Sequence, residues 1–270
     1  MRPGADGDPV VLSTAEFDVV CEAERLTDHR HVVLEVPSPG ATYTERAELE
    51  AKAWAQLRAR GLAEPGRDRT SPELGDLLVL LDRPQLSIDL RVWAPGRSIR
   101  AQAAAAGEAA VLSIVDGDVV ELAPVRAGSL PEAAVSVAGT GPAGEGRPVS
   151  LPHEVLMAAS AATDATDPRS FAAELRDRGV SNDDAAALAR MSEGMGMRGQ
   201  FGVERRRSRG AKPVRGPRVV GFHDNASGRY LHVVRPSGDG RRWSTVVPAD
   251  NQRIASYVRE LVDETGDQLS

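Results

Sequence analysis

The stretch GRYLHVVRPSGDGRRWSTVVPADNQRIASYVREL, residues 228–261, shows most clearly how this chain folds. Two segments rich in alternating apolar residues, 229–235 and 242–247, predict strands joined by a glycine-containing turn. Asp250 then supplies the N-cap of a helix whose apolar residues between Ile254 and Leu261 lie on one stripe. The order strand, turn, strand, helix predicts an α/β (α+β) protein, and none of these residues forms a recognisable catalytic group.

Further strands are predicted upstream of this unit. Residues 86–93 alternate with Leu86, Ile88, Leu90 and Val92 on one face, and short turns separate them from the next apolar segments. Parallel neighbours would need long crossovers, so short turns indicate an antiparallel meander. The other predicted strands are 31–36, 76–82, 98–104, 110–115, 118–125, 197–205 and 217–224.

Helices are indicated by their capping residues. Ser13 with Glu16 and Thr42 with Glu45 form two capping boxes, and Gly61 is suited to end the second of these helices. The remaining predicted helices are 129–136, 153–161, 168–178 and 182–193.

The chain reads as one domain over residues 11–264. A Gly/Pro-rich linker at 139–148 separates a first half, 11–138, from a second half, 149–264, and residues 1–10 are expected to be a disordered leader. The GTGPAG within the linker fits a dinucleotide-binding pattern formally, but no helix begins at its third glycine.

The two halves share short sequence matches. LRARGL (57–62) matches LRDRGV (175–180), Gly96-Arg97 matches Gly228-Arg229, and SIV (113–115) matches STV (244–246). The offsets of 118, 132 and 131 residues suggest a duplicated helix-then-sheet unit, although chance similarity is the competing interpretation.

Composition narrows the function. The net charge of −6 argues against nucleic-acid binding, and no apolar run is long enough for membrane insertion. The N-terminus has no signal-peptide core, and the single cysteine, Cys21, suits a reducing cytoplasm.

No catalytic or metal site is expected, and no cofactor. His223 precedes Asp224 near a strand end, but no activated serine completes a triad, so a structural histidine bonded to its turn is favoured. His29 and His31 lack cysteine or carboxylate partners at metal-binding spacing.

The segment 191–202, MSEGMGMRGQFG, is the candidate partner surface. Methionine packs adaptably and is over-used on surfaces that accept helical partners, although filling of the helix–sheet core is the competing and simpler interpretation. The basic run at 204–216 is either a solvated loop or a docking loop for an acidic partner. The predicted partner-binding residues are Val155, Leu156, Met191, Met195, Met197, Arg198, Phe201, Arg205, Arg206 and Arg207.

The chain resembles the EspG family of type VII (ESX) secretion-associated proteins. The resemblance rests on LSTAEFDVV (12–20), VPSPGATYTERAEL (36–49), RGQFGV (198–203) and the opening stretch, and it covers about 11–263. It implies one domain with a central twisted antiparallel sheet, flanking helical bundles and quasi-two-fold related halves. In characterised members a long hairpin loop between early strands contributes to client binding. The candidate loops here, 82–84 and 94–98, are short, so the resemblance does not identify the client.

The resemblance also implies a function. EspG proteins are non-enzymatic cytosolic chaperones that bind the helical tip of the PPE partner in PE–PPE pairs and keep it soluble for export. We therefore expect a chaperone for a PE–PPE-like helical substrate, itself a monomer or weak homodimer. The alternatives are a regulatory or structural module that self-associates through its sheet and, less favoured, a hydrolase that uses His223 and Asp224.

Overall fold

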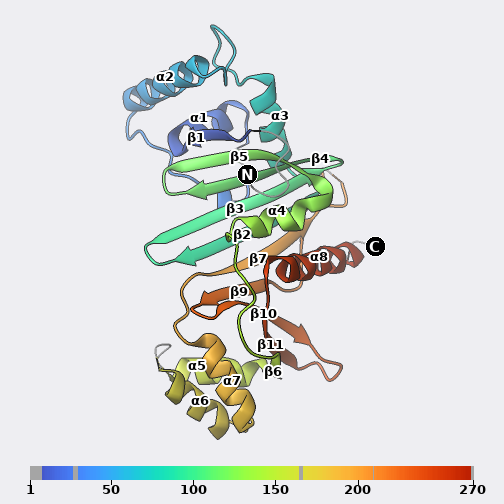
Figure 1. Cartoon of the computed structure of the whole chain (residues 1–270). Coiled ribbons are helices and arrows are strands. Elements are labelled where there is room, and N and C mark those ends of the chain that lie inside the picture. Colours follow the sequence, from blue (N-terminus) through green and yellow to red (C-terminus); the bar gives the residue numbers. More distant parts are fainter. Residues whose placement is uncertain (1–7, 27–29, 164–166, 209, 269–270) are drawn as a thin grey trace.

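The computed structural model describes residues 8–26, 30–163, 167–208 and 210–268. Its strands belong to one 11-stranded sheet (Figure 1). In chain order they are β1 (Val10–Ser13), β2 (Leu86–Ala94), β3 (Arg97–Ala106), β4 (Ala109–Asp116), β5 (Val119–Arg126), β6 (Val149–Pro152), β7 (Arg198–Arg205), β8 (Val214–Arg215), β9 (Val220–Asn225), β10 (Gly228–Pro236) and β11 (Arg242–Pro248).

The sheet order is β1-β5-β4-β3-β2-β7-β9-β10-β11-β6, with β8 paired to β7 off this path. All of these strand pairings are antiparallel, as the short turns predicted. The predicted strands in 86–125 and 197–247 are therefore confirmed. Adjacent strands β2 and β7 join the two halves at the centre of the sheet, in register from Leu86↔Arg205 to Trp93↔Arg198.

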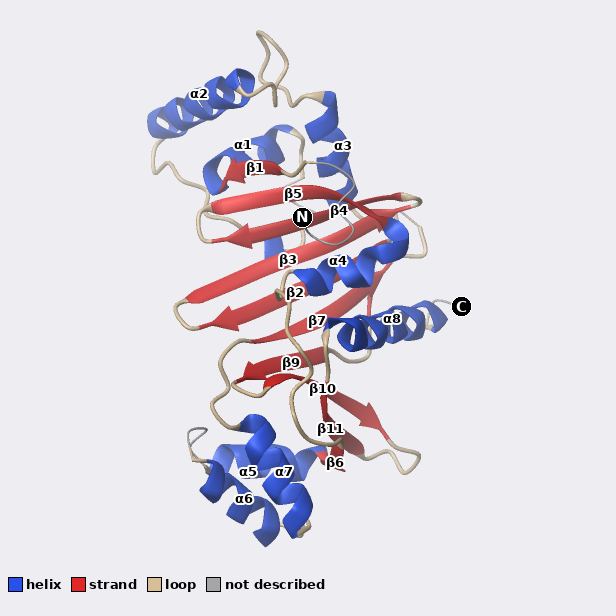
Figure 2. Ribbon diagram, in the orientation of Figure 1, coloured by secondary structure: helices blue, strands red, loops and turns tan. Residues whose placement is uncertain are grey.

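Helices cover the sheet unevenly (Figure 2). They are α1 (Thr14–Ala23), α2 (Tyr43–Ala59), α3 (Pro72–Leu81), α4 (Leu130–Ser136), α5 (His153–Ala162), α6 (Pro168–Asp177), α7 (Asn182–Ser192) and α8 (Asn251–Asp267), with 3-10 turns η1 (Val32–Leu34) and η2 (Ala127–Ser129). Helices α4 and α8 lie across the middle of one face. Helices α1–α3 sit at one end of the sheet and α5–α7 at the other.

Three apolar clusters correspond to these layers. Alternate residues of the central strands, such as Leu90 and Phe201, pack with α4 and α8. The residues between them point to the opposite face, where Ala104 packs with α1–α3 and Tyr230 packs with α5–α7. The two end clusters therefore share one face and leave the sheet between them uncovered by helices.

Two predicted strands are wrong. Residues 31–36 contain the 3-10 turn η1, and residues 76–82 lie mostly in α3. Ser71 accepts a hydrogen bond from the Leu74 amide and Pro72 occupies the first turn, so a helix starts there. A short continuous apolar run cannot by itself distinguish a buried strand from a buried helix.

The edge strands β1 and β6 were not predicted. Val10 pairs with Leu122, so the last residue of the expected leader belongs to the sheet, while residues 1–7 lie outside the described residues. Both strands are only four residues long and pass directly into helices, which hides their period-two pattern. The capping box of Ser13 and Glu16 is confirmed, as is that of Thr42 and Glu45.

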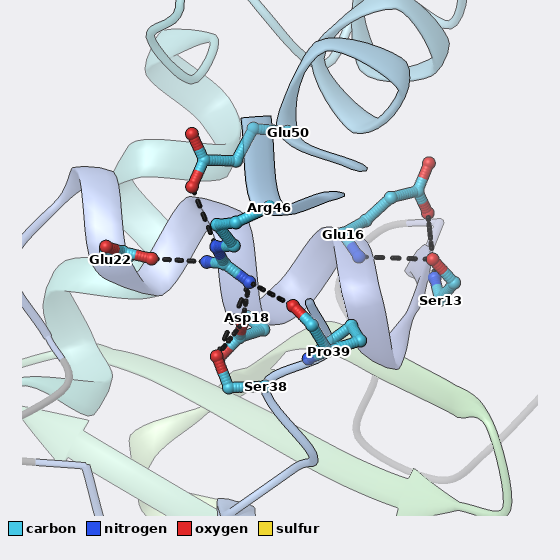
Figure 3. A network of polar contacts seen from close by, with 8 residues as sticks. All are labelled: Ser13, Glu16, Asp18, Glu22, Ser38, Pro39, Arg46 and Glu50. Carbon is cyan, nitrogen blue, oxygen red and sulfur yellow. Dashed lines mark hydrogen bonds and ion pairs between the residues drawn. The ribbon is translucent and has the colours of Figure 1, made fainter. Parts of the chain in front are cut away.

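Arg46 ties α1 and α2 together at the first end of the sheet (Figure 3). Its guanidinium donates to Asp18 at 2.7 Å and to Glu50 at 2.7 Å, and it also contacts Glu22 and the Pro39 carbonyl. These contacts raise the pKa of Arg46, because three carboxylates stabilise its charge against the cost of burial.

The predicted linker at 139–148 lies against the sheet. Arg229 donates its backbone N–H to the Pro142 carbonyl and accepts from the Gly144 amide, both at 2.9 Å. A Cβ at Gly144 would lie 2.2 Å from the Tyr230 ring, so this approach requires glycine. The segment is part of the folded unit.

Element order is the same on both sides of the β2–β7 pair. Counting outward, β3, β4, β5 and β1 stand opposite β9, β10, β11 and β6. Gly61 and Gly179 both follow a helix, α2 and α6, with positive φ. Gly96, however, lies in the β2–β3 turn and Gly228 follows the β9–β10 turn, which stands opposite β3–β4. The predicted match of these two glycines is therefore shifted by one strand. The match of 113–115 with 244–246 is shifted in the same way, because 113–115 lies in β4 and 244–246 lies in β11, whereas β10 stands opposite β4.

Candidate partner-binding site

An apolar cavity of about 260 Å3 opens where α5–α7 meet β9–β11. The helices around it are fixed by their caps: Asp167 accepts from the Arg169 amide with Pro168 at N1, and Ser181 accepts from the Asp184 amide. Leu175 and Leu188 are buried between helix and sheet. The apolar part of the cavity wall consists of Leu156, Met157, Pro168, Phe171, Ala189, Met195 and Val246.

The cavity leads onto the uncovered part of the sheet. Trp93, Arg198 and His223 are register partners on β2, β7 and β9, and His223 lines the cavity. Trp93 is 38% exposed, and Arg198 and Gln200 are exposed beside it. A strip of sheet with an aromatic, a guanidinium and an amide therefore continues the apolar cavity. We call the cavity and this strip together the saddle surface.

Only part of the predicted patch lies on this surface. Leu156 and Met195 line the cavity, with Met195 41% exposed, and Arg198 lies on the strip. Val155 packs partly against the α5–α7 cluster, and Met197 against the central cluster.

Phe201 and Met191 are core residues, which corrects their assignment to the partner surface. Phe201 has no exposed surface because its position on β7 points it toward α8, where it contacts Phe222 with ring centroids 5.7 Å apart. Met191 lies on the buried face of α7 with 1% exposure. The core-filling alternative holds for these two side chains.

The basic residues at 205–207 lie away from the cavity. Arg205 is the last residue of β7, and Arg206 and Arg207 come directly after it. The Arg206 amide donates to the Gln85 carbonyl at 2.9 Å. Arg205 and Arg206 are half-buried and Arg207 is exposed. Because Arg198 and Arg205 are at opposite ends of β7, the structure does not bring them into one basic rim.

Sequence reasoning missed Met157 and Phe171. Met157 is 51% exposed beside the cavity, and Phe171 packs partly against the α5–α7 cluster while also lining the cavity. The amphipathic pattern of α6 was a usable signal for Phe171, which shares a face with Leu175 at a spacing of four residues.

Two histidines, His223 and His232, line the cavity on its sheet side, and the other polar lining residues are Ser160, Thr163, Asp167, Ser192 and Glu193. His223 Nε2 lies 2.8 Å from the Met191 carbonyl, so this ring bonds to the end of α7 and not to its own turn as predicted. His232 lies on the sheet face opposite Leu231 and Val233, and burial lowers its pKa to about 4. Burial also lowers the pKa of His223, so both rings are neutral at pH 7.

The Asp224 carboxylate forms an ion pair with Arg229 and not with His223. The guanidinium of Arg229 donates to both carboxylate oxygens of Asp224, Nε at 2.7 Å and Nη2 at 2.8 Å. A dyad of His223 and Asp224 is therefore not formed. Within the described residues no group of three His, Cys, Asp or Glu side chains is placed to hold a metal ion, and no helix has the length and apolarity to cross a membrane.

The sequence model of the EspG family matches residues 13–260. No curated protein matches the chain. Among solved structures, the chain is similar to the Mycobacterium tuberculosis type VII secretion system chaperone EspG5 in complex with the PE25–PPE41 dimer. The TM-score is 0.72 at 16% sequence identity, covering 95% of this chain and 96% of that chain.

Proposed function

The chain belongs to the EspG family, and on that premise we propose that it is a cytosolic chaperone for a PE–PPE-like secretion substrate. EspG proteins are type VII secretion chaperones and not enzymes. The structurally similar EspG5 was solved in complex with the PE25–PPE41 dimer. By analogy, the client of this chain is a helical protein whose apolar tip is kept soluble before export.

The saddle surface is the proposed client site. The observation that carries this assignment is the apolar cavity with two exposed methionines, Met157 and Met195, at its wall. Soluble proteins rarely leave such hollowed apolar surface open, and methionine side chains adapt to helices of different shape. Trp93 and Arg198 on the adjoining strip are of the residue types enriched in binding hot spots.

Substitution on the saddle surface tests the proposal. Met195→Asp places a charge in the apolar contact, and loss of one buried anchor costs about 2 kcal/mol or more, roughly 30-fold in affinity. The control is Val79→Asp, which introduces the same charge at a residue 53% exposed on α3, at the other end of the sheet. Affinity for a co-purified PE–PPE-like pair is measured for both variants.

The result depends on both variants remaining folded, which their thermal midpoints report. Weak binding by Met195→Asp alone supports the site. If both folded variants bind at full strength, and Trp93→Asp does so too, the client binds elsewhere. Co-purification from the native host with mass spectrometry identifies the client independently.

We further propose that the chain is a monomer or weak homodimer and that its halves arose by duplication. The same order of elements on both sides of the β2–β7 pair, and the equivalent positions of Gly61 and Gly179, support a duplication. Sedimentation of the purified protein tests the first point. Superposition of 11–138 on 149–264 tests the second, which requires β3 to align with β9 and β4 with β10.

A further inference from the structure

A second cavity, of about 180 Å3, lies on the same sheet face beside the α1–α3 cluster. Unlike the saddle surface it is mostly polar, and loop, sheet and hairpin residues contribute to it. Its polar wall consists of Arg30, His31, Ser87, Gln102, Glu204 and Arg206, and we call it the Arg30 pocket.

Arg30 is half-buried, and its guanidinium has no ion pair with any residue that the structure describes. Its Nε and Nη1 atoms are buried and have no hydrogen-bond partner among the described residues. One face of its guanidinium lies over the Phe17 ring, 5.7 Å from the centroid. The neighbouring thiol of Cys21 stays protonated at pH 7, because burial raises its pKa to about 11, so it supplies no negative charge. A partly buried guanidinium in this position favours an anion beside it.

The acidic groups near the pocket are already paired. Arg215 donates to Asp89 at 3.1 Å and lies 3.5 Å from Glu204. His31 Nδ1 accepts from the Val33 amide, so the ring proton is on Nε2, which lies 3.6 Å from Glu204.

The local charges leave one positive charge in excess. Arg206 lines the pocket and donates from Nη1 to the Ala211 carbonyl, which is uncharged. Three guanidiniums, those of Arg30, Arg206 and Arg215, therefore face two carboxylates. A single negative charge in the pocket balances them.

Gln102 specifies a second property of the ligand. This side chain is 1% exposed, and its Oε1 is buried without a donor among the residues that the structure describes. A ligand that satisfies the pocket must accept hydrogen bonds from Arg30 and donate one to Gln102 Oε1. A carboxylate or a sulfate ion has no proton to donate. A protonated phosphate ion has both an acceptor oxygen and a hydroxyl, and it fits the volume.

We propose that the Arg30 pocket binds one protonated inorganic phosphate ion. The singly charged form is dihydrogen phosphate: its two unprotonated oxygens accept from the guanidiniums of Arg30 and Arg206, and one of its two hydroxyls donates to Gln102 Oε1. The ion would join three segments that are far apart in the sequence: the loop before η1, the β2–β3 pair and the hairpin after β7.

Phosphate and sulfate titrations at equal ionic strength and pH 7 test the proposal, with phosphorus NMR line width and thermal midpoint as readouts. Phosphate at up to about 20 mM should raise the midpoint saturably and broaden the phosphorus signal, and sulfate should not raise the midpoint. Arg30→Gln should weaken phosphate binding by at least about tenfold. The control Arg235→Gln removes another arginine with a buried, unpartnered Nε outside the pocket, and it should bind like the parent.

Gln102→Met keeps the volume and removes the acceptor, so it should reduce the preference for phosphate over sulfate. If Arg30→Gln does not fold, the proposal is tested by the phosphate-over-sulfate preference of Gln102→Met and by the phosphorus line width measured with the parent protein. Absence of saturable binding to the parent, or equal binding by folded Arg30→Gln, overturns the proposal. Phosphoserine is titrated in the same way. If it binds more tightly than inorganic phosphate, the ligand is a phosphorylated group and not a free phosphate ion, which overturns the proposal.

Discussion

Replacing Arg229 by Met should destabilise the fold strongly and leave the saddle surface in place. Arg229 is 1% exposed and joins β10 to the 138–144 segment and to α8. Its side chain donates to Asp224, to the Ala138 carbonyl at 2.8 Å and to the Gly139 carbonyl at 3.1 Å, and it also bonds to Asn251. Methionine fills a similar volume and makes none of these bonds.

The expected loss follows from what is left unpaired. Breaking a buried ion pair by removing one partner costs about 3–5 kcal/mol. Asp224 is 24% exposed and regains some hydration, which places the loss near the lower end, while the orphaned Ala138 carbonyl adds about 1 kcal/mol or more. We expect about 3–4 kcal/mol, and roughly 2–4 °C of thermal midpoint for each kcal/mol in a chain of this size.

Urea unfolding followed by circular dichroism measures the free energy of unfolding for the parent and for Arg229→Met. Arg229→Met with Asp224→Leu should be less destabilised than the sum of the two single variants, because no unpaired carboxylate remains. A loss below about 1 kcal/mol in the single variant, or strict additivity in the double variant, would refute the view that this buried pair holds the segment on the sheet.

Three further outcomes are expected. Gly144→Ala forces a Cβ to 2.2 Å from the Tyr230 ring and should lower the thermal midpoint by several degrees, through a loss of about 1–3 kcal/mol. The free energy of unfolding should fall as pH falls from about 6.5 to about 4, because His232 binds a proton in the unfolded chain but stays neutral in the folded one. His232→Phe should flatten this dependence when the unfolding free energy is measured across the same pH range. Phe201→Asp buries an unpaired carboxylate in the core and should yield no cooperative thermal transition, whereas a folded variant would contradict the burial of this ring.

The sequence by itself determined the local elements whose signals depend only on neighbouring residues. The capping boxes at Ser13 and Thr42, the strands with clean alternation and the Asp250 cap all form as predicted. The EspG resemblance also follows from the order of short motifs along the chain. The local elements are set by backbone hydrogen bonding and side-chain periodicity within about ten residues.

Only the tertiary structure decided which face each side chain occupies. Met195 and Phe201 belong to one short segment, yet Met195 lines an open cavity and Phe201 is completely buried under α8. Likewise, Asp224 follows His223 in sequence, but its carboxylate pairs with Arg229 across the β9–β10 hairpin. Sequence spacing specifies alternation along a strand. Which of the two faces is covered depends on helices from other parts of the chain, such as α8 over Phe201, because burial is a property of the assembled layers.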